Sequence, residues 1–154
     1  MFAKTLAVLA FLALAVSLRA DQPDAGGWVY DSGLGVVSNS TDGTVFNATL
    51  ANGSELKLVT AVSIGSSVLD FRLPVCSADG QTTYSIVGFG ASLLKQKTTI
   101  KEVYLPDGLQ TIGNECFKGC SALWKIEPFL PSTLTAVPPL NSWGTAVTND
   151  LKLC

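Results

Sequence analysis

The sequence predicts a mainly β protein, in which a β-rich N-terminal meander continues into a short repeat solenoid with small helical turns. Two observations predict this fold class. Residues 28–73 are rich in Val, Thr, Ser, Gly and Asn and alternate between apolar and polar positions, as strands do. The segment 85–109 aligns with the segment 110–134 that directly follows it, which indicates a repeat. At 154 residues, the chain is long enough for one domain with its own core.

Residues 1–20 predict a secretory signal peptide. Lys4 supplies a positive charge ahead of the apolar run 5–16, which is shorter than the roughly 20 residues that a transmembrane helix needs. Cleavage after Ala20 or after Ser17 fits the sequence, and an uncleaved anchor is the alternative. We therefore expect the protein to be secreted or held at the cell surface.

The charge balance excludes two classes of partner. The whole chain has 10 basic and 12 acidic side chains, a net charge of −2, and no basic stripe. Nucleic-acid binding and polybasic membrane attachment both need clustered Lys and Arg. The apolar runs after residue 20 are interrupted by Gly, Ser or Asp, so we expect no membrane span after removal of the signal.

Residues 21–84 are predicted to form a β-rich cap. The run 44–62 contains Asn52-Gly53 between two alternating segments, which is the strongest short-range signal for a hairpin. A third alternating run, 67–75, sets Val68, Asp70 and Arg72 against an apolar face. The Asp-Gly turn in 77–81 follows it. The predicted arrangement is a small antiparallel meander.

Residues 85–154 are predicted to form about two and a half repeats. When the two segments are aligned, Pro131 falls on Pro106 and Leu134 on Leu109. In each unit a short strand ends at the proline, which cannot continue a ladder, and the stacked units bury a shared apolar ladder. The predicted ladder residues are Val87, Ile100, Val103, Leu105, Leu109, Ile112, Phe117, Cys120, Leu123, Ile126, Leu134 and Leu151.

One unit carries the pattern L-P-x-x-L-x-x-I-G-x-x-x-F-x-G-C-x-x-L-x-x-I, from Leu105 to Ile126. This pattern resembles the BspA-like class of leucine-rich repeats, which occur in secreted and cell-surface proteins, and residues 67–137 carry the resemblance. It implies a leucine-rich-repeat solenoid and a role in adhesion to host or matrix proteins. It also implies that Cys120 is a small buried ladder residue.

The four cysteines are Cys76, Cys116, Cys120 and Cys154. An even number in an exported chain can pair as disulfides, in any of three connectivities. The four-residue spacing of Cys116 and Cys120 on a short helical turn is long for disulfide geometry, so we interpret both as packed thiols. A structural zinc site is not expected, because the chain has no histidine and no CxxC pair.

The absence of histidine also removes Ser-His-Asp and Cys-His nucleophile chemistry. Carboxylates remain, but residues such as Asp70, Asp79 and Glu115 fall in turns or on polar strand faces, where hydration accounts for them. No set of residues matches the requirements of an active site. We predict a protein that is not an enzyme and that uses no cofactor and no metal.

These expectations combine into an exported, non-catalytic module that binds a protein or a surface ligand. The candidate binding face lies on the outward side of two repeat strands, where Tyr104 and Trp124 supply aromatic anchors. The face consists of Lys101, Glu102, Tyr104, Trp124, Lys125 and Glu127. The alternative is a structural protein or a truncated fragment of a larger surface protein. Missing repeats, or a dimer formed through the C-terminal edge or Cys154, would then complete it.

Three N-x-S/T sequons begin at Asn39, Asn47 and Asn52. They would accept glycans in a eukaryotic secretory pathway. Asn, Ser and Thr are also common in exposed turns, and a mid-strand or tight-turn position is awkward for a glycan. We favour the absence of glycans at all three positions.

Overall fold

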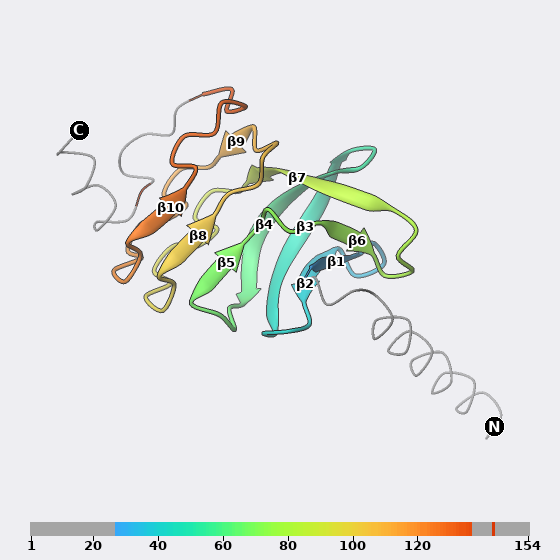
Figure 1. Cartoon of the computed structure of the whole chain (residues 1–154), viewed down its shortest axis with the longest axis horizontal. Helices are drawn as coiled ribbons and strands as arrows, with labels where there is room; N and C mark the ends of the chain where they lie inside the picture. Colours follow the sequence, from blue (N-terminus) through green and yellow to red (C-terminus); the bar gives the residue numbers. More distant parts are fainter. Residues whose placement is uncertain (1–26, 137–142, 144–154) are drawn as a thin grey trace, which may run out of the picture.

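The computed structural model describes residues 27–136 and 143. Within this part of the chain the regular structure is entirely β, with ten strands and no helix (Figure 1). The prediction of a leucine-rich-repeat solenoid with small helical turns is therefore wrong. The strands are β1 (Trp28–Asp31), β2 (Val36–Asn39), β3 (Thr44–Asn52), β4 (Glu55–Ser63), β5 (Val68–Asp70), β6 (Val75–Ser77), β7 (Thr83–Phe89), β8 (Glu102–Tyr104), β9 (Thr111–Ile112) and β10 (Lys125–Glu127).

Six strands close into a mixed barrel. Their order is β4-β3-β2-β1-β6-β7, and a parallel pairing between β4 and β7 joins the two ends. The pairs β1–β2, β2–β3, β3–β4 and β6–β7 are antiparallel, whereas β1–β6 is parallel. Strand β9 pairs with β7 outside this closed set. Closure satisfies the backbone groups of β4 and β7 that an open meander would leave at its edges.

The predicted β3–β4 hairpin is confirmed. Asn52 pairs with Glu55, so the two-residue turn consists of Gly53 and Ser54, one position later than the Asn-Gly signal suggested. Gly53 has a φ of +50°, which its lack of a Cβ permits. The apolar residues Phe46, Ala48, Leu56 and Leu58 of the two strands are buried, as alternation requires.

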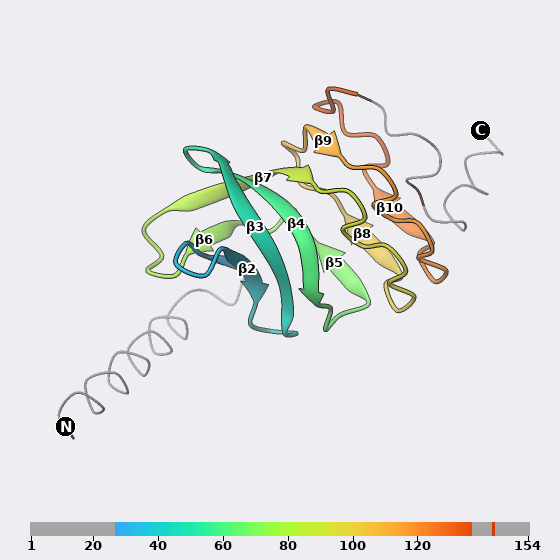
Figure 2. The same cartoon turned by 180° about the vertical axis from the view of Figure 1, so that it is seen from behind.

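A second, smaller sheet contains β5, β8 and β10 in parallel, beside the barrel (Figures 1 and 2). Lys125 of β10 pairs with Glu102 of β8, a register that differs from the 25-residue offset of the sequence alignment. The third member, β5, comes from residues that were assigned to the cap. Strand β7 of the barrel also extends across residue 85, where the repeats were expected to begin.

Residues 114–119 form turns instead of the expected short helical turn. Their backbone follows that of residues 92–96: Asn114 accepts a hydrogen bond from Ser92 N at 2.9 Å, and Lys118 accepts one from Gln96 N at 2.7 Å. Gly113 is required here because a Cβ at this position would lie 2.3 Å from the backbone nitrogen of Ala91. The glycine thus permits close approach of two chain segments.

A row of aromatic side chains runs through the core and connects the barrel to the C-terminal segments. Trp28 stacks on Phe71 with ring centroids 5.2 Å apart, and Phe71 meets Phe89 edge to face at 5.1 Å. Phe89 contacts Phe117 at 6.4 Å, and Phe117 stacks on Trp143 at 5.6 Å. All five residues of this aromatic row are buried, so barrel and small sheet share one apolar interior.

Candidate functional site

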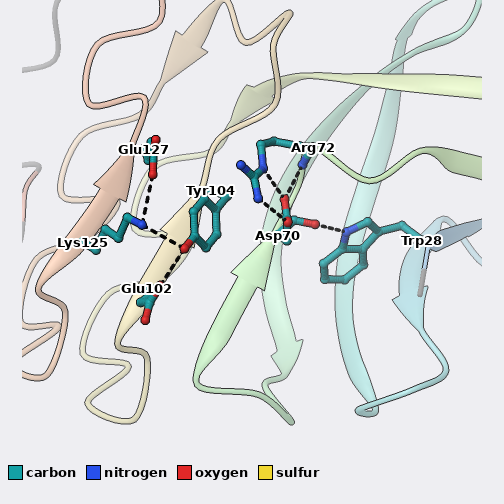
Figure 3. A network of polar contacts seen from close by, with 7 residues as sticks. All are labelled: Trp28, Asp70, Arg72, Glu102, Tyr104, Lys125 and Glu127. Atoms are coloured by element: carbon teal, nitrogen blue, oxygen red, sulfur yellow. Dashed lines mark hydrogen bonds and ion pairs between the residues drawn. The ribbon is translucent and has the colours of Figure 1, made fainter. Parts of the chain in front are cut away.

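The small parallel sheet has one buried side and one polar side. Leu69, Val103 and Ile126 occupy the middle position of the three strands, lie in register and are buried. Because strand side chains alternate, the flanking residues point the other way. We call the resulting polar surface the sheet face; it consists of Asp70, Arg72, Glu102, Tyr104, Lys125 and Glu127 (Figure 3).

Register determines which of these side chains meet. Asp70, Tyr104 and Glu127 lie side by side in the parallel ladder. Glu102 and Lys125 form the preceding row. Neighbouring strands are about 4.8 Å apart, which brings the side chains of each row within contact distance.

At one side of the sheet face, Arg72 holds Asp70 in a bidentate ion pair. Arg72 Nε donates to Asp70 Oδ1 at 2.9 Å, and Nη2 donates to Oδ2 at 2.7 Å. The backbone nitrogen of Arg72 also donates to Oδ1, at 3.0 Å. The side-chain hydrogen bonds from Arg72 lower the pKa of Asp70 below its ordinary value, so this carboxylate is charged at neutral pH.

Tyr104 is the centre of the sheet face. The Arg72 guanidinium carbon lies 4.1 Å from the centroid of the Tyr104 ring, a cation–π contact. The Tyr104 hydroxyl donates to Glu102 Oε2 at 2.7 Å and accepts a hydrogen bond from Lys125 Nζ at 3.0 Å. Lys125 Nζ also pairs with Glu127 Oε2 at 3.1 Å. The hydrogen bond to Tyr104, followed by the one to Glu127, raises the pKa of Lys125.

The sheet face is anchored to the barrel through Trp28. The indole Nε1 of this β1 residue donates a hydrogen bond to the backbone carbonyl of Asp70 at 2.8 Å (Figure 3). The Trp28 ring itself is buried and stacks on Phe71. This hydrogen bond therefore covers part of the outer edge of β5 and connects the sheet face to β1 of the barrel.

Four of the six predicted face residues belong to the sheet face: Glu102, Tyr104, Lys125 and Glu127. Lys101 and Trp124 immediately precede β8 and β10, and Trp124 N donates to the Lys101 carbonyl at 3.0 Å. Both side chains are exposed, Trp124 by 55 %. Tyr104 is in register with Glu127 and not with Trp124, so the two aromatic residues occupy different rows.

Sequence reasoning missed Asp70 and Arg72 as members of the sheet face. Alternation in the run 67–75 already assigned both to a polar side, and that signal was correct. Nothing local showed that β5 pairs with β8, because the two strands are far apart in the chain. The missing information was a long-range pairing.

Of the predicted ladder residues, ten are buried, and Leu134 is partly buried against the core. Leu151 lies outside the described residues, as do the predicted signal peptide and Cys154. The ten buried residues are Val87, Ile100, Val103, Leu105, Leu109, Ile112, Phe117, Cys120, Leu123 and Ile126.

Three cysteines fall in the described ranges, and all three are free thiols. Cys116 and Cys120 are buried, and Cys120 Sγ contacts the carbonyl oxygen of Leu94 at 2.9 Å. Burial raises the pKa of both thiols, which keeps them protonated and poorly nucleophilic. Cys76 on β6 is half-buried.

A second charged cluster lies on the turns 92–96 and 114–119. The Glu115 carboxylate accepts a hydrogen bond from Lys95 Nζ at 2.6 Å and another from Lys118 Nζ at 2.5 Å. These two hydrogen bonds lower the pKa of Glu115 to about 2, the bond from Lys118 contributing most. The cluster joins the two stacked turns through their side chains.

Neither charged cluster offers a metal site. Among residues 27–136 and 143, no group of three or more His, Cys, Asp or Glu side chains is arranged to hold a metal ion. No helix in that same part of the chain is long and apolar enough to cross a membrane. The sheet face presents paired charges and a phenol, with the exposed Trp124 ring nearby.

In comparisons with known proteins, no family model matches the chain, and no curated protein or solved structure matches it. The resemblance of residues 67–137 to BspA-like repeats therefore rests on sequence patterns, the main one lying between Leu105 and Ile126.

Proposed function

We propose that this protein is an exported, non-catalytic module that binds a protein ligand through the sheet face. The observation that carries the proposal is the division of the small sheet into two sides. Leu69, Val103 and Ile126 hold it to the core. On the opposite side, the six residues of the sheet face form two hydrogen-bonded groups that the Arg72–Tyr104 cation–π contact joins. Such a face can be matched to a partner without altering the residues that maintain the fold.

The network supports binding because its side chains are already ordered. Arg72 is fixed by two hydrogen bonds to Asp70, and Tyr104 by Glu102 and Lys125. Ordering flexible side chains on association costs about 0.5–1.5 kcal/mol each, and a preorganised face avoids part of that cost. Mixed charges on such a face favour partners with a complementary charge pattern.

Trp124 supplies an apolar anchor next to this network. Its ring is 55 % exposed, and the residue directly precedes Lys125 of the sheet face. Trp, Tyr and Arg are the residue types most often found to dominate binding energy at protein interfaces. Trp124, Tyr104 and Arg72 together provide all three.

The test is a binding screen of the exported protein against extracellular matrix proteins and a glycan array. We expect binding to a protein, with at least a tenfold loss in Trp124→Ala and in Tyr104→Phe. Leu34→Ala is the matched control, because Leu34 is 75 % exposed and lies between β1 and β2, outside the segments that form the sheet face. Binding that persists in both face variants, or that is lost equally in Leu34→Ala, would contradict the proposal.

A second candidate is a structural subunit that completes its sheet with another copy. It is favoured by the position of β10 at the end of the order β10-β8-β5, where the described residues provide no further strand beyond it. Exposed sheet edges tend to pair with other chains. Size-exclusion chromatography with and without reductant tests this. A dimer that dissociates with reductant supports the Cys154 disulfide, a dimer insensitive to reductant supports edge pairing, and a monomer in both excludes this candidate.

A further inference from the structure

The tip of the β3–β4 hairpin carries the Asn52-Gly53 dipeptide, which the proposed binding function does not use. We propose that Asn52 is a site of spontaneous deamidation and that the product weakens the pairing that closes the barrel. The inference rests on three observations: the exposure of the turn, the hydrogen bonds of the neighbouring asparagines, and the position of the turn beside β7.

The reaction needs no cofactor other than water. The backbone nitrogen of Gly53 attacks the side-chain carbonyl carbon of Asn52, a C–N bond forms, and ammonia leaves with the proton of the attacking amide. The resulting five-membered succinimide adds water at either of its two carbonyls. One product is aspartate, and the other is isoaspartate, in which the backbone passes through the former side chain. Each product has exchanged an amide for a carboxylic acid.

The turn leaves both reacting groups accessible. Asn52, Gly53 and Ser54 are exposed, and a Cβ added at Gly53 would meet no atom within 4 Å. Among the described residues, the Gly53 N–H donates no hydrogen bond and the Asn52 side chain makes none. Glycine at the following position presents the least steric obstruction to the attacking nitrogen.

The two other sequon asparagines are held in place. Asn39 is only 8 % exposed, and its Oδ1 accepts a hydrogen bond from Thr41 N at 2.9 Å. Asn47 Nδ2 donates to Thr60 Oγ1 across the β3–β4 pair at 2.8 Å. Each is followed by a residue with a Cβ. Both the leaving amide and the attacking nitrogen are therefore less available at these positions.

The product would act on the barrel closure. Asn52 pairs with Glu55, so a carboxylate at position 52 places like charges opposite each other. Ser54 O accepts a hydrogen bond from Ser85 N at 2.9 Å, and Glu55 pairs with Ser85 where β4 joins β7. An isoaspartate at position 52 lengthens the backbone just before this junction, and the longer backbone disturbs the register of the β4–β7 pairing.

The experiment is to age the purified full chain at mildly alkaline pH and to follow it by isoelectric focusing and peptide mass spectrometry. Trypsin leaves Asn39, Asn47 and Asn52 on one peptide, because no Lys or Arg lies between Arg19 and Lys57, so fragmentation must assign the site. We expect a more acidic species whose amide-to-acid mass gain is located at residue 52. Isomerisation of an aspartate would leave the mass unchanged and is thereby distinguished.

Two variants complete the test. Asn52→Gln should abolish the acidic species, whereas the matched variant Asn47→Gln should leave its rate unchanged. Fresh Asn52→Asp, and aged protein purified by ion exchange, should unfold at lower urea concentrations than the fresh protein, and Asn47→Asp should not. A mass gain located at another asparagine would contradict the assignment of deamidation to Asn52. If the modified protein unfolds at the same urea concentration as the fresh protein, the proposal that the modification weakens the barrel is wrong.

Discussion

The guanidinium carbon of Arg72 lies 4.1 Å from the centre of the Tyr104 ring, and this contact links the turn after β5 to β8 on the sheet face. Arg72 is at the same time held by Asp70, and Tyr104 by Glu102 and Lys125. The contact therefore joins two hydrogen-bonded groups that come from distant parts of the chain.

This linkage predicts non-additive effects on stability. Arg72→Ala and Tyr104→Ala should each lower the urea midpoint of unfolding, and the double variant should lower it by less than the sum, because either change removes the shared contact. Lys57→Ala, on the exposed side of β4, should combine additively with Tyr104→Ala. Additive effects for the first pair would show that the contact contributes nothing.

Phe117→Ala should destabilise the fold strongly. The Phe117 side chain is fully buried and contacts Phe89 and Trp143 in the aromatic row, so truncation leaves a cavity in the shared core. We expect a loss of about 3–5 kcal/mol in the free energy of unfolding. Trp124→Ala, at an exposed aromatic residue, should change it by only about 0.5 kcal/mol or less. If both variants lower the free energy of unfolding equally in urea denaturation, the burial of Phe117 is contradicted.

Gly113→Ala tests the close approach of the two stacked turns. The new Cβ would lie 2.3 Å from the backbone nitrogen of Ala91, and backbone must move to accept it. We expect a cost of about 1–3 kcal/mol. Gly108→Ala is the control, since a Cβ there meets nothing within 4 Å. Thermal or urea unfolding of both variants provides the comparison, and a tolerated Gly113→Ala would refute the packing.

The three described cysteines should differ in reactivity. In native protein, alkylation followed by peptide mass spectrometry should modify Cys76 first, because Cys116 and Cys120 are buried and their thiol pKa values are raised. In denaturant all three should react at similar rates. Rapid native labelling of Cys116 would indicate that the core opens locally.

Glu115 should contribute to the loss of stability in acid. Its folded pKa of about 2 is below its ordinary value of 4.5, so its contribution is complete above pH 4.5 and disappears as the pH falls towards 2. Glu115→Gln should lower the urea midpoint at neutral pH and match the parent protein near pH 2. A midpoint that Glu115→Gln leaves unchanged at neutral pH, or lowers equally near pH 2, would contradict this role.

Much of the candidate site could be read from local patterns. Glu102, Tyr104, Lys125 and Glu127 alternate with buried residues, and a period of two is enough to assign them to a solvent face. Asp70 and Arg72 showed the same alternation. Their partnership with Tyr104 was not predictable, because it depends on which strands pair and in which register.

The sequence by itself determined the β class of residues 28–73, the β3–β4 hairpin and the interior position of most apolar residues, since propensity, turn chemistry and alternation are local properties. Only the tertiary structure decided that β4 pairs with β7 to close a barrel, and that Lys125 of β10, rather than Glu127, lies opposite Glu102 of β8. Matching of apolar positions permits several registers, and backbone hydrogen bonding with side-chain packing selects one. Barrel closure likewise joins β4 to β7, which have no local signal for each other, so it depends on a long-range pairing that only the folded chain provides.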